Sequence, residues 1–345
     1  MTFPQRPTLA DVAAEAGVST VTVSRVVEGS DKVAASTRER VLAAMDRIGY
    51  FGNAAASSLV SGRATTIGVI ASNTADFGYA TTIRGIEQAA RDTDMSVLIS
   101  VIEGEDPASV RRAVSTVASH ALAGVVVIDF DAAAHAVLPA LPAYLPVVST
   151  TQPGLDASGR PHVYIDEFEG ALTAATHLIE LGHRSILVLA PPDRRPQRRR
   201  PLGVETALTR AHLPHYPVVL CADWQPRSGY AGAVELLDAY GDQVTAIACG
   251  NDEIALGAIR AIRDRGLRVP EDVSVVGFDD HPVSAYSSPA LTTMHQDFET
   301  LGRLAFDQLD ALIAGREAPA AQSLTAALVV RETTAAPNPE RGPGR

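Results

Sequence analysis

From residue 66 onward, short apolar runs alternate with stretches of helical periodicity, and this alternation constrains the fold more than any other feature of the chain. The apolar runs, which we predict to be strands, are 67–71, 97–101, 124–128, 147–148, 186–189, 244–248 and 273–278. The helical stretches lie between them, at 80–91, 108–120, 170–181, 229–239 and 253–265. Such alternation is typical of parallel sheets with helices on both faces. Because these strands exceed one comfortable sheet, we predict an α/β body with two lobes.

Residues 8–27 have a different pattern, that of two short helices joined by a tight turn. Thr8 begins the first helix, Gly17 can take the left-handed conformation that ends it, and Ser19 can cap the second. The side chains predicted to point outward near the start of the second helix are Thr20, Val21, Ser24 and Arg25. This is the arrangement of a helix-turn-helix, whose second helix lies in the major groove of DNA.

A third helix is predicted to start at a capping box of Ser36 and Glu39 and to end at Gly49, with an apolar stripe that includes Leu42. An ordinary bundle of short helices would show the same pattern. The exposed position predicted for Val21 favours DNA, because an apolar side chain on a polar face fits contact with a thymine methyl group. An arginine at the next turn of the helix would read guanine or hold a phosphate.

The charge of the chain is divided unevenly between these two regions. Residues 1–63 carry 7 basic and 6 acidic side chains, whereas the remainder carries 22 and 34, for a net charge of −11. Only the N-terminal part escapes the acidic bias, so we expect DNA to bind there. Its small charge predicts weak non-specific affinity per subunit, which a dimer with two such domains would offset.

Composition and motifs exclude several classes of protein. The sequence has no apolar run of membrane-spanning length and no signal-peptide core at its start, so we expect a cytoplasmic protein without a membrane partner. Its two cysteines, Cys221 and Cys249, are predicted to be buried free thiols. The nine histidines have no metal-ligand spacing, and no nucleotide-binding, hydrolase or metalloprotease motif is present. We therefore expect neither an enzyme nor a metal or other cofactor.

Residues 8–59 resemble the DNA-binding headpiece of the LacI/GalR family of bacterial regulators, and the likeness extends along almost the whole chain. The stretches that carry it are LADVA (9–13), AGVS (16–19), TVSRVV (22–27), TRERV (37–41) and GY…NAAA (49–56). The resemblance implies a helix-turn-helix headpiece (1–52), a hinge helix or linker (53–63) and a body with the type I periplasmic-binding-protein fold (64–332). The implied lobes are about 64–163 with 293–322, and about 164–292 with 323–332.

The resemblance also implies which residues contact DNA. They are Thr8, Ser19, Thr20, Val21, Thr22, Ser24 and Arg25 of the headpiece, and Asn53, Ala56 and Leu59 of the hinge. Leu59 resembles the family's minor-groove wedge, which kinks a central base step; simple linker packing is the alternative. The hinge has too few apolar side chains to be a stable helix by itself, so we expect it to fold only on operator DNA.

Two candidate ligand-binding residues follow predicted strands of the body. Asn251 follows 244–248 and Asp279 follows 273–278, and ligands of open α/β sheets bind beyond the carboxyl ends of strands. A helix N-cap and a turn acid are the alternative roles. The motifs GNDEIALGA (250–258) and VVGFDD (275–280) resemble the family's effector-site segments, which favours binding. A carboxylate at Asp279 could accept hydrogen bonds from neighbouring sugar hydroxyls.

The resemblance adds Arg200, Trp224 and Phe298 to this effector site. Trp224, the only tryptophan of the chain, is expected to stack on a sugar ring, although a lone tryptophan usually packs in a core. The chain departs from the family where an acidic sugar ligand is expected, because it has Thr150 and Thr151 there. The role of the basic run 194–200 stays open between a solvated loop and a nucleic-acid or phosphate site.

The function predicted from these features is that of a transcriptional regulator, most simply a repressor. A small effector, a sugar or glycoside, would control its affinity for a pseudo-palindromic operator; a purine is the alternative effector, and a solute-binding protein is the rival function. Residues 333–345 contain three prolines, two glycines and no leucine, which excludes a heptad helix for tetramer formation. We therefore predict a homodimer with a disordered C-terminal tail.

Overall fold

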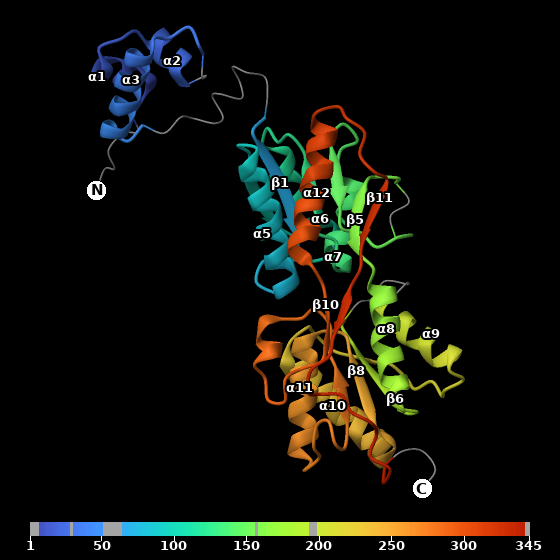
Figure 1. The fold of residues 1–345 in the computed structure, drawn as a ribbon. Helices are drawn as coiled ribbons and strands as arrows, with labels where there is room; N and C mark the ends of the chain where they lie inside the picture. The colour runs from blue at the N-terminus through green and yellow to red at the C-terminus, as the bar shows by residue number, and fades with distance from the viewer. Residues whose placement is uncertain (1–6, 28–29, 51–63, 156–157, 193–198, 342–345) are drawn as a thin grey trace. The chain divides into compact units, whose positions relative to one another are not determined.

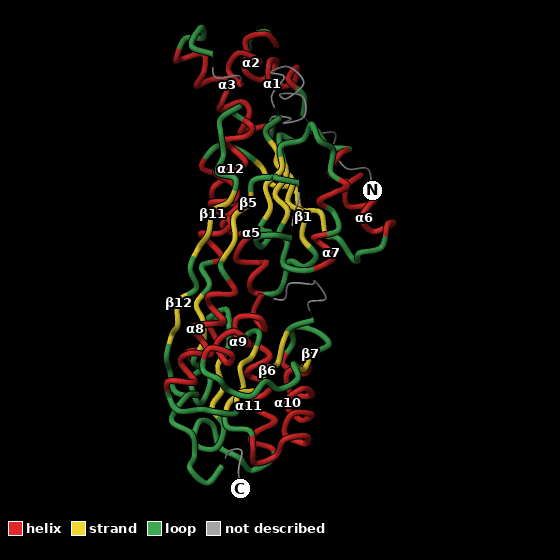
Figure 2. The backbone as a smooth tube through the Cα atoms, turned by 90° about the vertical axis from the view of Figure 1, so that its right-hand side faces the viewer, coloured by secondary structure: helices red, strands yellow, loops and turns green. Residues whose placement is uncertain are grey.

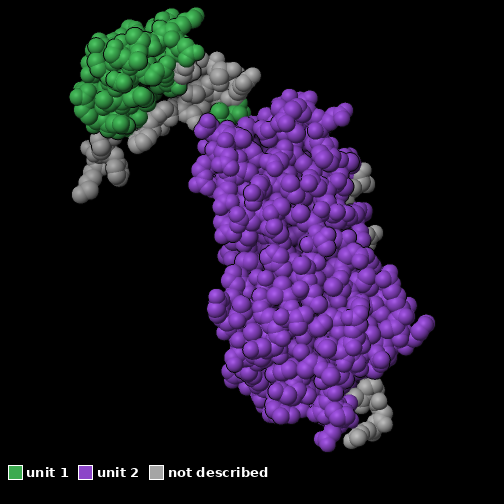
Figure 3. All heavy atoms as spheres, viewed as in Figure 1, with its two compact units in different colours: residues 1–65 green, residues 66–345 purple. Residues whose placement is uncertain are grey.

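The computed structural model describes residues 7–27, 30–50, 64–155, 158–192 and 199–341. The chain forms two units, residues 1–65 and 66–345, which Figure 3 shows in different colours. The predicted hinge residues Asn53, Ala56 and Leu59 lie outside the described residues. No helix in the described parts of the chain is long and apolar enough to cross a membrane.

The N-terminal unit contains helices α1 (Leu9–Ala16), α2 (Thr20–Val27) and α3 (Ala35–Ile48). Its core is small and consists mainly of valine and alanine side chains: Val12, Ala13, Ala16, Val23, Val26, Val41 and Ala44. The predicted helix ends at α1 and α2 are confirmed. Thr8 and Asp11 form a capping box, Gly17 has a φ of 64°, and the Ser19 hydroxyl accepts the backbone N–H of Thr22 at 3.2 Å.

The start of α3 differs from the prediction. The helix begins at Ala35, after Ala34, and no side chain caps it, so the predicted box of Ser36 and Glu39 is absent. Leu42, predicted to face the core, is 47% exposed, because Val41 and Ala44 already fill the face that contacts α1 and α2. Gly49 does end the helix, with a φ of 67°.

The body has two lobes, each built around a parallel sheet (Figures 1 and 2). The sheet of lobe 1 has the order β11-β5-β4-β3-β1-β2. Its strands are β1 (Thr66–Ala71), β2 (Ser96–Val101), β3 (Val125–Val127), β4 (Val147–Ser149), β5 (His162–Ile165) and β11 (Ala321–Leu324). Its helices are α5 (Phe77–Asp92), α6 (Pro107–Ala118), α7 (Ala132–His135), the 3-10 helix η1 (Leu138–Ala140) and α12 (Phe298–Ile313).

Alternation along β1 explains why both faces of this sheet are covered. Ile67 and Val69 lie in the core shared with α5 and α12, whereas Ile70 lies in a separate core with α6 and η1. Successive side chains of a strand point to opposite faces, so a continuous apolar run needs helices on both. The prediction of an α/β body with parallel sheets is confirmed.

Lobe 2 repeats the plan with a sheet of order β7-β6-β8-β9. Its strands are β6 (Ile186–Ala190), β7 (Val219–Leu220), β8 (Ala246–Cys249) and β9 (Ser274–Val276). Helices α8 (Glu167–Glu180) and α9 (Arg199–Arg210) cover one face, and α10 (Pro226–Tyr240) and α11 (Asp252–Asp264) cover the other. Short 3-10 helices, η2 (Gly241–Gln243) and η3 (Pro282–Ala285), lie in its loops. Cys221 and Cys249 are buried free thiols, as predicted.

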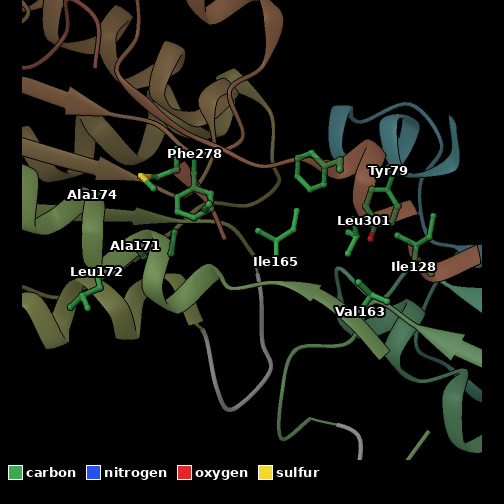
Figure 4. Packing of buried hydrophobic residues seen from close by; sticks show 14 of the residues in the cluster. Tyr79, Ile128, Val163, Ile165, Ala171, Leu172, Ala174, Phe278 and Leu301 are labelled. Atoms are coloured by element: carbon green, nitrogen blue, oxygen red, sulfur yellow. The ribbon is translucent and has the colours of Figure 1, made fainter. Parts of the chain in front are cut away.

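The chain passes between the lobes three times, after β5, after β10 (Thr293–His295) and after β11. Strand β10 pairs antiparallel with β12 (Ala327–Val329) near the second and third of these passages. One apolar core runs from lobe to lobe through Ile165, with Phe278 on one side and Tyr79 and Leu301 on the other (Figure 4). The passages therefore connect lobes that already share a core.

The C-terminal segment corrects a prediction. Residues 333–341, expected to be disordered, lie against lobe 2 (Figure 1). Thr333 is fully buried, its carbonyl accepts the Val275 N–H at 2.8 Å, and its hydroxyl donates to the Val275 carbonyl at 2.6 Å. The Asn338 amide donates to Asp272 at 3.1 Å. Hydrogen bonds to β9 and its neighbours hold this segment in place, so it is ordered although it has few apolar side chains.

Candidate functional site

The N-terminal unit presents one candidate nucleic-acid surface, along α2. Thr20 in the first turn and Arg25 in the last turn are exposed, and Val21 is 57% exposed although it is apolar. Ser19 and Thr22 lie beside them, with their hydroxyls 2.9 Å apart, while Ser24 is half-buried and Thr8 is exposed at the start of α1. The predicted headpiece residues therefore lie along α2, the helix that a helix-turn-helix presents to base edges, except for Thr8 at the start of α1.

The body contains a pocket between its lobes, where loops that follow β1, β3 and β4 face loops that follow β8 and β9. The residues predicted to bind the effector all line it: Arg200, Trp224, Asn251, Asp279 and Phe298. All but Phe298 come from lobe 2. Distant parts of the chain meet there because the carboxyl ends of parallel strands share one edge of each sheet.

Asp279 belongs to the polar wall of this pocket, which consists of Glu167, Arg200, Asn251, Glu253, Asp279 and Gln296. Its φ of 113° is unusual for a residue other than glycine, and such backbone persists only where its surroundings hold it. Here its N–H donates to the Met294 carbonyl at 2.8 Å, and its carboxylate accepts the Gln296 side-chain amide at 2.6 Å. The Arg200 guanidinium is 3.5 Å from the same carboxylate oxygen.

Arg200, at the start of α9, connects several groups of the polar wall. It is 2.8 Å from the Glu167 carboxylate, and it donates to the carbonyl of Gly250. Its guanidinium carbon also lies 4.4 Å from the Phe278 ring centroid and 5.6 Å from that of Trp224. A planar cation held in this way can bind a ligand oxygen and still stack on an aromatic face.

Asn251 caps a helix and also lines the pocket. Its side-chain oxygen accepts the Ile254 N–H at 2.8 Å and so caps α11, while its side chain also lines the pocket. Its amide nitrogen donates to Glu253 at 2.8 Å and to the carbonyl of Trp224 at 3.2 Å. The cap fixes the Asn251 side chain, so that its amide group can hold Glu253 and the backbone of Trp224 in place at the pocket.

Burial raises the pKa of the pocket carboxyls Asp76, Glu253 and Asp279. For Asp279 the Arg200 guanidinium works in the opposite direction, but burial is the larger cause. Burial also raises the pKa of Asp252, behind the pocket, to about 7, although it accepts hydrogen bonds from His281, Ser284 and Thr293. Hydrogen bonds to a ligand are stronger at a site that is buried from water in this way.

Sequence reasoning missed most of the wall that lobe 1 contributes. Phe77, Tyr79 and Phe130 line the pocket with Phe298, and their rings form a chain of contacts with centroid distances between 4.9 and 5.9 Å. Further lining residues that were not predicted are Asp76, Gly78, Thr150, Gln152, Ile165, Glu167, Glu253, Gln296 and Leu301. Phe77 and Phe130 each follow a predicted strand, which is the signal that could have revealed them.

Two family models match the chain. The model of bacterial regulatory proteins of the lacI family matches residues 8–53, and that of the periplasmic binding protein-like domain matches 175–334. The lactose operon repressor of Escherichia coli K12 is 36% identical over 338 residues, which cover 96% of this chain and 91% of the repressor. The regulator CelR of Thermobifida fusca is 34% identical, with 95% and 98% covered. The chain belongs to the LacI family.

Solved structures agree with this LacI-family membership. The lac repressor dimer bound to operator and the anti-inducer ONPF superposes with a TM-score of 0.86 at 33% identity, covering 96% of this chain and all of that one. A CelR–cellobiose complex gives 0.72 at 32% identity, covering 95% and 100%. The helix-turn-helix headpiece and the type I periplasmic-binding-protein body are thereby confirmed. Among the described residues, no group of three or more His, Cys, Asp or Glu side chains could hold a metal ion.

Proposed function

We propose that this LacI-family chain is a homodimeric repressor that binds a pseudo-palindromic operator through α2 and the hinge residues Asn53, Ala56 and Leu59, and that a sugar or glycoside between the lobes controls this binding. It acts as a binding protein in the cytoplasm and not as an enzyme. The convergence of Arg200, Trp224, Asn251, Asp279 and Phe298 in one pocket carries the proposal. Its carboxylates, guanidinium and rings suit the hydroxyls and apolar faces of a sugar.

The effector is tested by following the fluorescence of Trp224, the only tryptophan and a pocket residue. The panel consists of glucose, galactose, mannose and xylose, each as the free sugar and as its methyl and phenyl glycosides, together with purine bases and nucleosides. Binding of a sugar or glycoside supports the proposal. Purines are the second candidate, because the aromatic wall could stack a base and the purine repressor PurR of Klebsiella pneumoniae is 33% identical. Binding of purines alone would contradict a sugar effector.

DNA binding is tested with Arg25→Ala at matched salt. A bidentate contact from Arg25 to guanine is worth about 1–3 kcal/mol, so the variant is expected to lose discrimination between operator and random DNA. Arg47→Ala is the matched control, since Arg47 pairs with Glu15 within the headpiece. Equal operator affinity of Arg25→Ala and the wild type would show that α2 is not the reading helix.

The hinge and the assembly have separate tests. Hydrogen exchange of residues 53–61 is expected to slow only when operator is bound, whereas equal protection without DNA would contradict coupled folding.

Sedimentation at micromolar concentration is expected to give twice the chain mass of 36.2 kDa. A stable tetramer would contradict the proposed dimer.

A further inference from the structure

The loop that follows β3 places Phe130 in the pocket between two carboxylates, Asp129 and Asp131. Phe130 is half-buried and lines the pocket, with its ring centroid 4.9 Å from that of Tyr79 and 5.7 Å from that of Phe298. Neither neighbouring aspartate lines the pocket. Both carboxylates instead bind groups of lobe 1, so the ring is held from both sides along the chain.

Asp129 is the anchor on the N-terminal side and is 1% exposed. Its backbone N–H donates to the Thr150 hydroxyl at 2.9 Å, and its carboxylate accepts the Thr151 hydroxyl at 2.6 Å. The His135 ring nitrogen Nδ1 lies 2.8 Å from the same carboxylate oxygen. These two threonines replace the acidic residue expected in the family at the end of β4. In this chain Thr150 binds the backbone and Thr151 the carboxylate of Asp129, which follows the neighbouring strand β3.

Asp131 is the anchor on the C-terminal side. One oxygen caps α7 by accepting the Ala134 N–H at 3.0 Å. The other accepts the Tyr79 hydroxyl at 2.7 Å and the hydroxyl of Ser72, which follows β1. Burial raises the pKa of Tyr79 well above its usual value, so the phenol stays protonated and remains a donor. Asp131 therefore joins β1, α5 and α7 below the aromatic wall.

We propose that Asp129 and Asp131 are positioning residues, which fix Phe130 and Tyr79 as a preformed aromatic face for the effector without touching it. Hydrogen bonds with α5, with α7 and with the residues that follow β1 and β4 hold the two aspartates that flank the ring. Binding to a ring that is already fixed costs less side-chain conformational entropy than binding to a ring that becomes ordered only with the effector. This inference rests on the proposed effector site, because it assigns the purpose of the wall that lobe 1 contributes.

Fluorine NMR tests the anchoring without any effector. The chain contains eight phenylalanines, which can be replaced together by 4-fluorophenylalanine, and Phe130→Leu assigns the resonance of Phe130. In Asp131→Asn the amide nitrogen cannot accept from Tyr79 and Ser72, so this resonance is expected to shift and broaden. Asp106→Asn is the matched control, since Asp106 caps α6 in the same lobe. An unchanged Phe130 resonance in Asp131→Asn would overturn the inference.

A double-mutant cycle then tests whether Asp131 acts through Phe130. The probe is the phenyl glycoside with the largest Trp224 response in the panel described above. Asp131→Asn is expected to weaken its binding at least fivefold in the wild type and less than twofold in a Phe130→Ala background, with operator affinity unchanged. Equal losses in both backgrounds would overturn the inference.

Tyr79→Phe provides a milder variant if Asp131→Asn does not fold, because it removes one donor to Asp131 and keeps the ring. The same shift of the Phe130 resonance is expected, to a smaller extent, and its absence would contradict the anchoring. If no sugar or glycoside binds, the proposed effector class is wrong, and the fluorine spectra alone then decide the anchoring.

Discussion

The two lobes share one folding plan but face the pocket with different chemistry. Lobe 1 contributes the rings of Phe77, Tyr79, Phe130 and Phe298. The carboxylates of Asp129 and Asp131 lie beside Phe130 in the chain and form hydrogen bonds within the lobe. Lobe 2 contributes the ring of Trp224 and, mainly, a guanidinium, an amide and carboxylates that bind one another. Lobe 1 also has polar lining residues, which are Thr150, Gln152 and Asp76; the Asp76 carboxylate accepts the Gln225 amide of lobe 2 at 3.3 Å.

This difference indicates how each lobe contributes to binding. The polar groups of lobe 2 already have partners, so a ligand must replace those hydrogen bonds and gains only about 1 kcal/mol for each. A ligand that fails to replace one leaves a buried polar group unpaired, which costs more than the bond gains. Lobe 2 is therefore expected to select the ligand, whereas burial of apolar area against lobe 1 supplies affinity.

The described part of the C-terminal segment completes the hydrogen bonds of lobe 2 and not those of lobe 1. Deletion of residues 332–345 is therefore expected to have the largest effect on the free energy of unfolding. Without Thr333, the N–H and carbonyl of Val275 and the N–H of Thr292 lose their partners. Each buried group left unpaired costs about 1–3 kcal/mol, so we expect a loss of roughly 5 kcal/mol, as measured by urea unfolding followed at Trp224. Deletion of 342–345 is the control. Equal unfolding midpoints of the two deletions would show that the segment does not complete lobe 2.

Asp279→Asn tests the selectivity assigned to lobe 2. An amide cannot replace both acceptor oxygens, and a buried polar group left unpaired costs about 1–3 kcal/mol, so effector affinity should fall roughly 10- to 100-fold. Operator affinity should not change, which would give a repressor that no longer responds to effector. Asp264→Asn, an exposed acid in the same lobe, is the control. A normal response of Asp279→Asn to the effector would remove Asp279 from the site.

The dependence of stability on pH should also be traced to lobe 2. His183 is 1% exposed, and burial lowers its pKa from 6.5 to about 4. The unfolded chain thus binds a proton that the folded chain does not, so this histidine lowers stability as pH falls from about 6.5 to about 4. At pH 5 the loss is about 2 kcal/mol relative to pH 7.

Replacement of this histidine should remove that part of the pH dependence. His183→Gln keeps a donor for the carbonyl of Ala335, which accepts from His183 at 2.9 Å. His120→Gln, at an exposed position in lobe 1, is the control. Identical pH profiles of the wild type and His183→Gln between pH 5 and 7 would contradict this assignment.

The smallest effect is expected in lobe 1. The phenyl glycoside of a bound sugar should bind about tenfold more tightly than its methyl glycoside, because an aromatic pair adds about 0.5–1.5 kcal/mol to simple burial. Phe77→Ala should remove most of this difference and leave methyl-glycoside binding nearly unchanged. Tyr144→Ala, at an aromatic side chain of lobe 1 that is 83% exposed, is the control. A difference that survives in Phe77→Ala would show that this ring does not contact the glycoside's phenyl group.

Several features of the fold could be predicted from local sequence patterns. Buried strands such as β1 and β6 were predicted because their continuous apolar runs need no partner to be recognised. Strand β11, with the sequence AQSL, was missed, since it is a strand only by pairing with β5. Arg200, Asn251 and Asp279 of the polar wall were predicted because they follow strands or resemble family motifs, whereas Glu167, Glu253 and Gln296 were not. Of the aromatic wall only Phe298 was predicted, by family resemblance, because phenylalanines near a helix start are usually read as core.

The sequence by itself determined the helix-turn-helix and the parallel sheets, because helix caps and the periods of helices and strands depend on residues only a few positions apart. Resemblance to family motifs added Arg200, Asn251 and Asp279 of the polar wall. Only the tertiary structure showed that residues 333–341 are ordered and that Phe130 is anchored by its two neighbouring aspartates. Thr333 binds Val275, and Tyr79 binds Asp131, 58 and 52 positions away along the chain. Such hydrogen bonds leave no local period, so they become visible only when the chain is folded.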